Sequence, residues 1–179
     1  MKQQVVVSGR TLLKIAIIKS SLGIKGDMKI VPFFLTVKEL KELLSTCSNE
    51  VYLFSVGTFP KKISLKEVKQ NNLGLTISLV GVNDRTSSDK LKDLEVLVDN
   101  DAYKVFLVRT KNIFRLVGYN VIDKDMGQLG QVHDVLRGKQ ELLSLDDKEE
   151  KLIPFVNDLI ESVDDDNKVI RTILPEGIF

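Results

Sequence analysis

The chain lacks tryptophan, and only 6% of its 179 residues are aromatic. Proteins that bind single-stranded nucleic acid without sequence preference stack successive bases on aromatic side chains, so a continuous stacking platform is not expected. Long apolar runs are missing as well, because Arg10 and Lys14 interrupt the N-terminal segment before it reaches the length of a signal peptide or a membrane span. The sequence therefore predicts a soluble cytoplasmic protein that does not contact a membrane.

Cysteine and histidine each occur once, as Cys47 and His133. A single cysteine excludes an internal disulfide and fits a reducing compartment, and one thiol with one imidazole leaves a transition-metal site short of ligands. His133 precedes Asp134 in the segment GQLGQVHDVL, residues 127–136, but neighbouring side chains of a strand point to opposite faces. We therefore expect no catalytic dyad, no metal and no cofactor.

The glycine-bearing and acidic segments do not match nucleotide-binding or calcium-binding loops. GIKGDMK lacks the Lys-Ser/Thr pair that closes a phosphate-binding loop, and GQLG enters a strand rather than a helix. VDDDNK lacks the alternating ligands and the distant glutamate of a calcium loop and is typical of a hairpin turn. We therefore predict that the protein is not an enzyme, and an enzyme would need a deep pocket built from residues distant in sequence.

Apolar residues at every second position predict short β-strands along most of the chain. In the first half the predicted strands are residues 11–20, 27–33, 51–56, 75–82 and 94–99. In the second half they are residues 119–123, 129–136, 141–145, 151–156 and 168–174, with Gly127 and Asn167 suited to turns of positive φ. Many short strands favour closed or nearly closed barrels, because closure removes exposed strand edges. The predicted fold is therefore mainly β.

One or two short helices interrupt this pattern. Thr36 and Glu39 have the spacing of a capping box before an apolar face made by residues 37, 40, 43 and 44. A shorter helix is predicted in residues 87–94, opened by Ser87 or Ser88.

Charge is divided unevenly along the chain, although its net value is only +1. Residues 1–98 hold 15 Lys and Arg against 9 Asp and Glu, or +6, whereas residues 99–179 hold 11 against 16, or −5. Such a chain can face one anionic and one cationic partner, and a chance distribution is the alternative. We place a first domain at residues 1–98, a linker at 99–112 and a second domain at 113–179.

The second half resembles the PRC-barrel domain of the RimM family of ribosome maturation factors. The matching features are Gly118, Gly127, the LG.V.DVL strand, the LIPF tetrapeptide, the hairpin SVDDDNKVI and the closing LPEG. The first half is similar to the N-terminal barrel of that family, through the glycine loop in IKSSLGIKGDMKIVPF and the segment GVNDRTSSDKLKDLEVLVD. The resemblance covers nearly the whole chain in the same order.

The resemblance implies two tandem β-barrels, the first similar to translation-factor barrels and the second of the PRC type. It also implies a non-enzymatic factor that assists assembly of the head of the small (30S) ribosomal subunit and processing of 16S rRNA. The implied partners are a basic protein of the subunit head, of the S19 family, and nearby 16S rRNA. A monomer is expected. A PRC-barrel adaptor that binds proteins unrelated to the ribosome is the alternative.

The chain departs from the family pattern at two places. Leu22 stands where the family usually carries a histidine before its opening-loop glycine. Lys111, Asn112 and Ile113 stand where the family carries two tyrosines and often a tryptophan, and residues 115–118 replace the Asp-Leu-Ile-Gly sequence that follows. That aromatic motif is tied to subunit binding in the family, so its contact residues do not transfer directly.

Candidate binding residues follow from charge, from glycine and from position. Lysines bind phosphate as mobile point charges, and glycines let the backbone turn tightly and approach a ligand. The candidates for rRNA contact in the basic half are Lys14, Lys19, Gly23, Lys25, Gly26, Lys29, Lys61 and Lys62. The candidates for ribosomal-protein contact are Tyr103, Phe106, Lys111, Asn112 and Phe114. For each lysine the alternative is a solvated strand face, and for the aromatic residues it is burial in a barrel.

Overall fold

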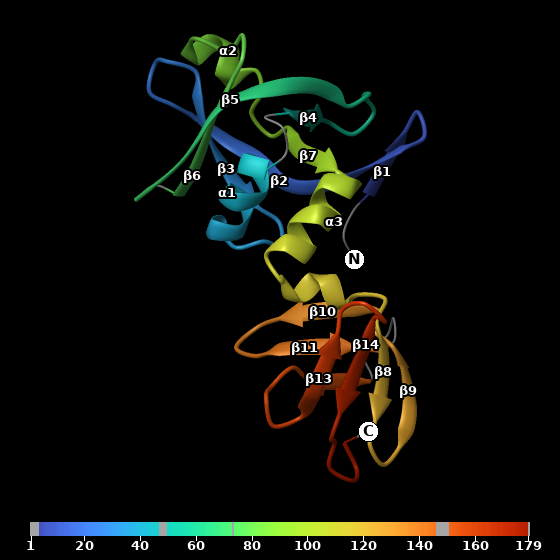
Figure 1. Ribbon diagram of the computed structural model, residues 1–179. Coiled ribbons are helices and arrows are strands. Elements are labelled where there is room, and N and C mark those ends of the chain that lie inside the picture. The colour runs from blue at the N-terminus through green and yellow to red at the C-terminus, as the bar shows by residue number, and fades with distance from the viewer. Residues whose placement is uncertain (1–3, 47–49, 73, 146–150, 179) are drawn as a thin grey trace. The chain divides into compact units, whose positions relative to one another are not determined.

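The structure, a computed structural model, describes residues 4–46, 50–72, 74–145 and 151–178. The chain forms two compact units, Met1–Phe106 and Leu107–Phe179 (Figure 1). Each unit is built mainly from β-strands, which confirms the predicted fold class. Cys47 lies outside the described residues.

The first unit contains the five strands that the sequence predicts and two, β1 (Gln4–Val7) and β5 (Lys61–Asn71), that it does not. In chain order its elements are β1, β2 (Arg10–Leu22), β3 (Asp27–Pro32), α1 (Val37–Thr46), β4 (Glu50–Phe54), β5, β6 (Gly74–Leu79), α2 (Arg85–Asp89) and β7 (Glu95–Asp99). The helix α3 (Asn100–Arg109) spans the division between the units.

The first unit is a closed sheet with strand order β1-β2-β3-β6-β5-β4-β7, in which β7 also pairs with β2. The registers Leu13 with Val98 and Ile17 with Glu95 join β2 to β7 in antiparallel fashion and close the barrel. Its interior is apolar, because alternate residues of the strands face inward. The fully buried residues include Ile15, Ile18, Met28, Ile30, Leu75, Ile77, Val96 and Val98.

The helix α1 begins as the sequence predicts. The backbone N–H of Thr36 donates to Glu39 Oε2 at 2.8 Å, and the backbone N–H of Glu39 donates to Thr36 Oγ1 at 3.2 Å. This reciprocal pair is the capping box expected from the spacing. Leu40, Leu43 and Leu44 are fully buried, so the helix packs its apolar face into the unit.

The helix α2 begins earlier than predicted. Asp84, and not Ser87 or Ser88, is its N-cap residue, since Asp84 Oδ1 accepts a hydrogen bond from the backbone N–H of Ser87 at 2.8 Å. Ser87 lies inside the helix and also donates its hydroxyl to Asp84, at 2.7 Å. Aspartate and serine are equally good N-caps, so the sequence alone did not rank them correctly.

The second unit holds two small sheets. Its elements are the 3-10 helix η1 (Ile113–Leu116) and the strands β8 (Asn120–Asp123), β9 (Gly127–Gln131), β10 (Asp134–Arg137), β11 (Glu141–Ser144), β12 (Leu152–Pro154), β13 (Ile160–Asp164) and β14 (Val169–Thr172). One sheet has the order β13-β14-β8-β9, with β14 and β8 parallel, and the other has the order β10-β11-β12. Val121, Leu143, Ile153 and Ile170 are fully buried between them.

Two details of the second half differ from the sequence expectations. The predicted strand 129–136 is two strands, because the chain leaves one sheet at Gln131 and enters the other at Asp134. Gly127 has the expected positive φ of 75°, but in the hairpin after β13 the positive φ of 55° belongs to Lys168 and not to Asn167. No helix within the described ranges is long and apolar enough to cross a membrane.

Candidate functional site

The loop between β2 and β3 has a backbone shape that its glycines make possible. Gly23 and Gly26 have φ of 63° and 82°, a region that favours glycine. A Cβ on Gly26 would lie 2.3 Å from the carbonyl oxygen of Val82, so the backbone of this loop packs directly against the segment before α2. Gly26 is therefore needed for close packing, whereas a Cβ on Gly23 would meet nothing within 4 Å.

Side-chain hydrogen bonds hold both ends of the same loop. The Ser21 hydroxyl donates to Asp89 of α2, and the Ser78 hydroxyl of β6 donates to Asp27 at 2.5 Å. Ile24 is 78% exposed, and Lys25 is exposed beside it. The loop, which lies beside α2 in Figure 1, thus presents a lysine and an apolar side chain on a supported backbone.

Two further candidate lysines lie on the strands that flank this loop. Lys19 is the extra residue of a bulge between the pairs Ile18–Ile30 and Ser20–Lys29, and its side chain is exposed. Lys29 is half-buried and pairs on its other side with Thr76 of β6. The β2–β3 hairpin therefore brings together Lys19, Gly23, Lys25, Gly26 and Lys29.

Lys69 extends this basic surface, and the sequence analysis missed it. Thr76 pairs with Lys69 of β5 as well as with Lys29, so the two lysines flank Thr76 on adjacent strands. Lys69 Nζ forms an ion pair with Glu67 Oε2 at 2.5 Å. The hydrogen bond between these two side chains is the main cause of the raised pKa of Lys69. In the sequence, Lys69 is indicated only by the spacing of the lysines in residues 61–71. No strand was predicted for these residues, which form β5.

Lys14 is separated from these residues and is already engaged. Its Nζ lies 2.7 Å from Glu95 Oε2 and 5.1 Å from the centre of the Phe54 ring, and its side chain is only 12% exposed. Because Lys14 is paired with Glu95 and its side chain is largely buried, little of its ammonium group is accessible to an external phosphate.

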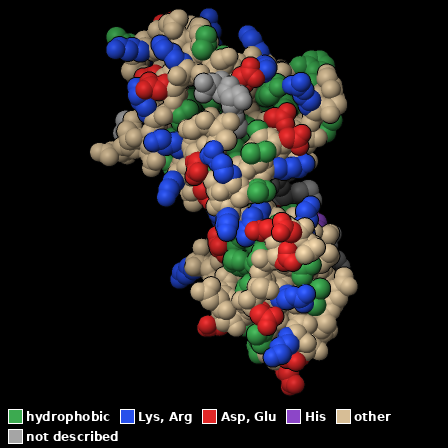
Figure 2. Space-filling view, in the orientation of Figure 1, with side chains coloured by type: hydrophobic (Ala, Val, Ile, Leu, Met, Phe, Trp, Pro, Cys, Tyr) green, Lys and Arg blue, Asp and Glu red, His purple; other side chains and the backbone are tan. Residues whose placement is uncertain are grey.

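Lys61 and Lys62 begin β5 and are both exposed. Lys62 pairs with Glu50 of the neighbouring strand at 2.6 Å, with both side chains about half exposed. On the face shown in Figure 2, lysine and arginine side chains lie at several separate places on the first unit, with acidic side chains between them. The eight candidates for rRNA contact are thus spread over β2, the β2–β3 loop, β3 and the start of β5.

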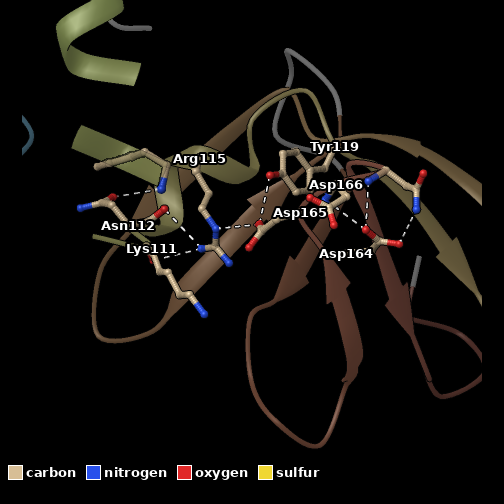
Figure 3. Close-up of polar contacts among 9 residues, drawn as sticks. Lys111, Asn112, Arg115, Tyr119, Asp164, Asp165 and Asp166 are labelled. Carbon is tan, nitrogen blue, oxygen red and sulfur yellow. Dashed lines mark hydrogen bonds and ion pairs between the residues drawn. The ribbon is translucent and has the colours of Figure 1, made fainter. Parts of the chain in front are cut away.

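The entry to the second unit is organised by Arg115 (Figure 3). Its Nε donates to Asp165 Oδ1 at 2.9 Å, and its Nη1 donates to the carbonyl oxygens of Lys111 at 3.0 Å and Asn112 at 3.4 Å. Tyr119 also donates its hydroxyl to Asp165 Oδ1, at 3.1 Å. Arg115 therefore ties the turn of residues 111–116 to the β13–β14 hairpin.

The charges of this cluster shift two pKa values. Burial alone would raise the pKa of Asp165, but hydrogen bonds from Arg115 and Tyr119 outweigh it and hold that pKa below its usual range. Burial, reinforced by the bond to Asp165, raises the pKa of Tyr119. At neutral pH Asp165 is therefore charged and Tyr119 is neutral.

The aromatic candidates for protein contact are buried. Tyr103 is 3% exposed and packs edge-on against Phe34 at 6.0 Å, and Phe106 is fully buried. Phe114 is 5% exposed, and the guanidinium carbon of Arg137 lies 4.6 Å from its ring centre. Burial is the alternative that the sequence left open for these side chains, and in this conformation they offer a partner almost no surface.

The two remaining candidates differ from each other in exposure. Asn112 is 7% exposed, and its Oδ1 caps η1 by accepting the backbone N–H of Phe114 at 3.1 Å. Lys111 is exposed and has a positive φ of 49°. Of the five candidates for protein contact, Lys111 is thus the one whose side chain faces solvent.

His133 is exposed in the link between β9 and β10, and its backbone N–H donates to Ser144 O at 2.7 Å. Asp134 Oδ1 accepts the backbone N–H of Val135 at 2.8 Å. Within the described ranges no group of three or more His, Cys, Asp or Glu residues is placed to hold a metal ion.

Comparisons with known proteins cover both units. Residues 13–103 match the family model of the RimM N-terminal domain, and residues 113–178 match that of the RimM PRC barrel domain. A ribosome maturation factor RimM from Thermoanaerobacter sp. (strain X514) is 29% identical over 163 residues, covering 90% of this chain and 95% of that protein. One from Clostridium botulinum (strain ATCC 19397 / Type A) is 29% identical over 172 residues, covering 95% of this chain and 98% of that protein.

Solved structures of more distant relatives were also found. The crystal structure of RimM from Pseudomonas aeruginosa, described as a 16S ribosomal RNA processing protein, is 18% identical and covers 92% of this chain and 98% of that one, with a TM-score of 0.46. The solution structure of the N-terminal domain of RimM from Thermus thermophilus is 19% identical and covers 51% of this chain and 92% of that one, with a TM-score of 0.39.

Proposed function

Because the chain belongs to the RimM family of ribosome maturation factors, we propose that it assists assembly of the small ribosomal subunit in the bacterial cytoplasm. In this proposal it binds the head of the immature subunit through a basic head protein of the S19 family and nearby 16S rRNA, and it makes and breaks no covalent bond. The observation that carries the proposal is the match of both units, in order, to the two domains of this family.

The basic β2–β3 hairpin is the proposed site of rRNA contact. Lys19, Lys25 and Lys29 lie on one supported hairpin, and Lys69 lies one strand further on. Lysines at such positions neutralise phosphates and provide affinity without reading sequence. Gly23 and Gly26 contribute by shaping the loop, and Lys14 contributes by supporting the barrel through Glu95.

The second unit is the proposed site of protein contact. It carries more acidic than basic residues, which complements the charge of a basic ribosomal protein and speeds its docking. We place the contact at the surface around η1, where Arg115 holds the acidic turn of Asp165 and Asp166. Both aspartates are exposed and supply the negative charge, and Lys111 is exposed at the start of the same turn region.

Asn112 and Phe114 support this surface from within the second unit, by capping η1 and by packing. Tyr103 and Phe106 are buried and belong to the first unit, so they are not part of this contact.

Sedimentation of cell extracts tests the proposal. The chain is expected to travel with free small subunits rather than with mature ribosomes, because the binding surface on the head is offered during assembly. Loss of the protein is expected to increase the amount of unprocessed 16S rRNA. A pull-down against the purified proteins of the subunit head then identifies the protein partner.

The adaptor alternative makes a different prediction in the same experiment. A chain that sediments away from ribosomal particles, together with normal 16S rRNA processing in its absence, would rule out the assembly function. Equal binding to free subunits and mature ribosomes would rule out a role restricted to maturation.

A further inference from the structure

The loop between β4 and β5, residues 55–60, displays two apolar side chains to solvent. Phe59 is 88% exposed and Val56 is 85% exposed, the highest fractions among the large apolar side chains of the described residues. Single exposed apolar residues are common on protein surfaces and need no explanation. The β4–β5 loop, however, exposes two apolar side chains within four residues, and one of them is the aromatic ring of Phe59.

The loop is a built turn. The backbone N–H of Thr58 donates to Ser55 O at 3.0 Å, the Thr58 hydroxyl donates to the same oxygen at 2.8 Å, and the backbone N–H of Ser55 donates to Thr58 Oγ1 at 3.3 Å. Gly57 has a φ of 85°, which this turn requires. Phe59 is thus held outward by a hydrogen-bonded backbone, which reduces the entropy lost when the loop binds a partner.

The charges next to the ring favour an anionic partner. Residues 55–62 include Lys61 and Lys62 and no acidic residue, and both lysines are exposed where β5 begins. Glu50 pairs with Lys62, which leaves the immediate surroundings of the loop net positive. A basic ribosomal protein would be repelled here, whereas phosphates would be attracted.

We infer that the β4–β5 loop contacts an unpaired base of the immature rRNA, with Phe59 stacked on the base and Lys61 and Lys62 beside the flanking phosphates. This inference rests on the proposed function and adds a second rRNA contact, separate from the β2–β3 hairpin. The low aromatic content of the chain excludes a platform for successive bases, but one exposed ring is enough to receive one base.

Substitutions at Phe59 test the stacking. Replacing an aromatic residue that stacks on a base weakens binding by about 5- to 150-fold. We expect Phe59→Ala and Phe59→Leu to weaken binding to immature small subunits and to single-stranded oligoadenylate by factors in this range, whereas Phe59→Trp retains it. Because the side chain is almost fully exposed, thermal unfolding of the three variants should match that of the unsubstituted chain.

Because the chain contains no tryptophan, a single introduced tryptophan can be followed by its fluorescence without background from other indoles. In Phe59→Trp the indole reports only on this loop, and stacking on oligoadenylate is expected to quench its fluorescence. Phe33→Trp is the matched control, since Phe33 is 47% exposed and lies in the same unit, after β3. Its fluorescence should not respond to oligoadenylate.

The outcomes separate this inference from the proposed function. Binding of Phe59→Leu that equals that of the unsubstituted chain, with Phe59→Ala weak, would indicate an apolar pocket on a protein and overturn base stacking. Subunit binding that is intact in all three variants would overturn the inference alone. A complete failure of the unsubstituted chain to bind immature subunits would overturn the proposed function as well.

Discussion

Asp123 is a buried carboxylate that is completely satisfied by hydrogen bonds. It is 2% exposed, and its Oδ1 accepts the backbone N–H groups of Asp125 at 3.0 Å and Met126 at 3.1 Å. Its Oδ2 accepts the Thr172 hydroxyl and the backbone N–H of Leu174, both at 2.9 Å. Burial by itself would raise the pKa of Asp123, but these four bonds outweigh it and lower that pKa to about 2.

Removing this charge is expected to destabilise the second unit. Asp123→Asn cannot accept all four bonds and should lower the free energy of unfolding by about 2–4 kcal/mol near neutral pH. The folded pKa of about 2 lies below the ordinary value of 3.8, so the stabilisation is present above pH 3.8 and is lost as the pH falls toward 2. Urea denaturation of both proteins across this pH range measures the effect.

The exposed neighbour Asp125 provides the control for this prediction. Asp125→Asn removes the same charge two residues away in the same turn and should change the free energy of unfolding by no more than about 0.5 kcal/mol. A difference between Asp123→Asn and the unsubstituted chain that stays constant from neutral to acid pH would contradict the assigned cause.

At the scale of elements, a side-chain cluster joins two segments that are distant in sequence. Arg115 in η1 reaches Asp165 in the turn between β13 and β14, and its guanidinium also holds the carbonyls that precede η1. The Arg115 side chain is 11% exposed and that of Asp165 is 44% exposed. The pair is therefore partly shielded from water and should be stronger than an ordinary surface ion pair.

We predict that Arg115→Met destabilises the protein by about 1–2 kcal/mol, because it removes the side-chain donor to the two carbonyls and leaves Asp165 with the Tyr119 hydroxyl alone of the two donors described. Asp165→Asn should also lower the pKa of Tyr119 toward its ordinary value of 10.0, since the carboxylate contributes to raising it. Ultraviolet titration of the tyrosines measures this shift. Arg171→Met removes one positive charge from an exposed position of β14 and is the control. If both arginine substitutions lower the free energy of unfolding equally, the hydrogen bonds of Arg115 are not the cause.

How well the sequence predicted each element depended on how local its cause was. The period-two strands and the capping box of Thr36 and Glu39 are set by near neighbours, and both were found in the structure. The helix α3 was not predicted, because Val105 and Val108 are exposed and its apolar residues form no single stripe. Its residues occupy most of the stretch predicted as a linker, whose boundaries stay a prediction.

The candidate sites depended on contacts that no local pattern reveals. Lys14 and Glu95 are 81 residues apart, and only the pairing of β2 with β7 places them together. The packing of Gly26 against Val82 and the burial of Phe114 are likewise products of the assembled units. Residue type and charge could indicate the kind of partner, but tertiary structure decides which side chains remain available to it.

At the scale of the whole molecule, the two units carry opposite net charge. Met1–Phe106 contains 16 Lys and Arg against 11 Asp and Glu, or +5, and Leu107–Phe179 contains 10 against 14, or −4, which sum to the +1 of the chain. The sign of each unit is the one expected for its proposed partner. Salt should therefore weaken the rRNA contact of the first unit most strongly.

Charge reversal on the β2–β3 hairpin tests this dependence. Each phosphate contact contributes about 0.7–0.9 to the slope of log affinity against log salt, so the double substitution Lys25→Glu and Lys29→Glu should reduce the slope by about 1.5. Binding of the protein to immature small subunits over a salt series measures it. The matched control reverses Lys38 and Lys41, which are exposed on α1 of the same unit. An equal loss of slope in both variants would show that net charge, and not the hairpin, governs binding.

The closure of the first barrel has a consequence for how this chain is made. β2 ends at Leu22, whereas its partner β7 begins only at Glu95, so β3 to β6 are synthesised between the two paired strands. Before β7 is synthesised, the edge of β2 that pairs with β7 has no partner strand. The β2–β3 loop also lacks its supporting contacts until residues 82–89 follow, because Gly26 packs against Val82 and Ser21 donates to Asp89. The first barrel therefore cannot close during synthesis until β7 has been added, because the β2–β7 pairing joins strands that are far apart in sequence.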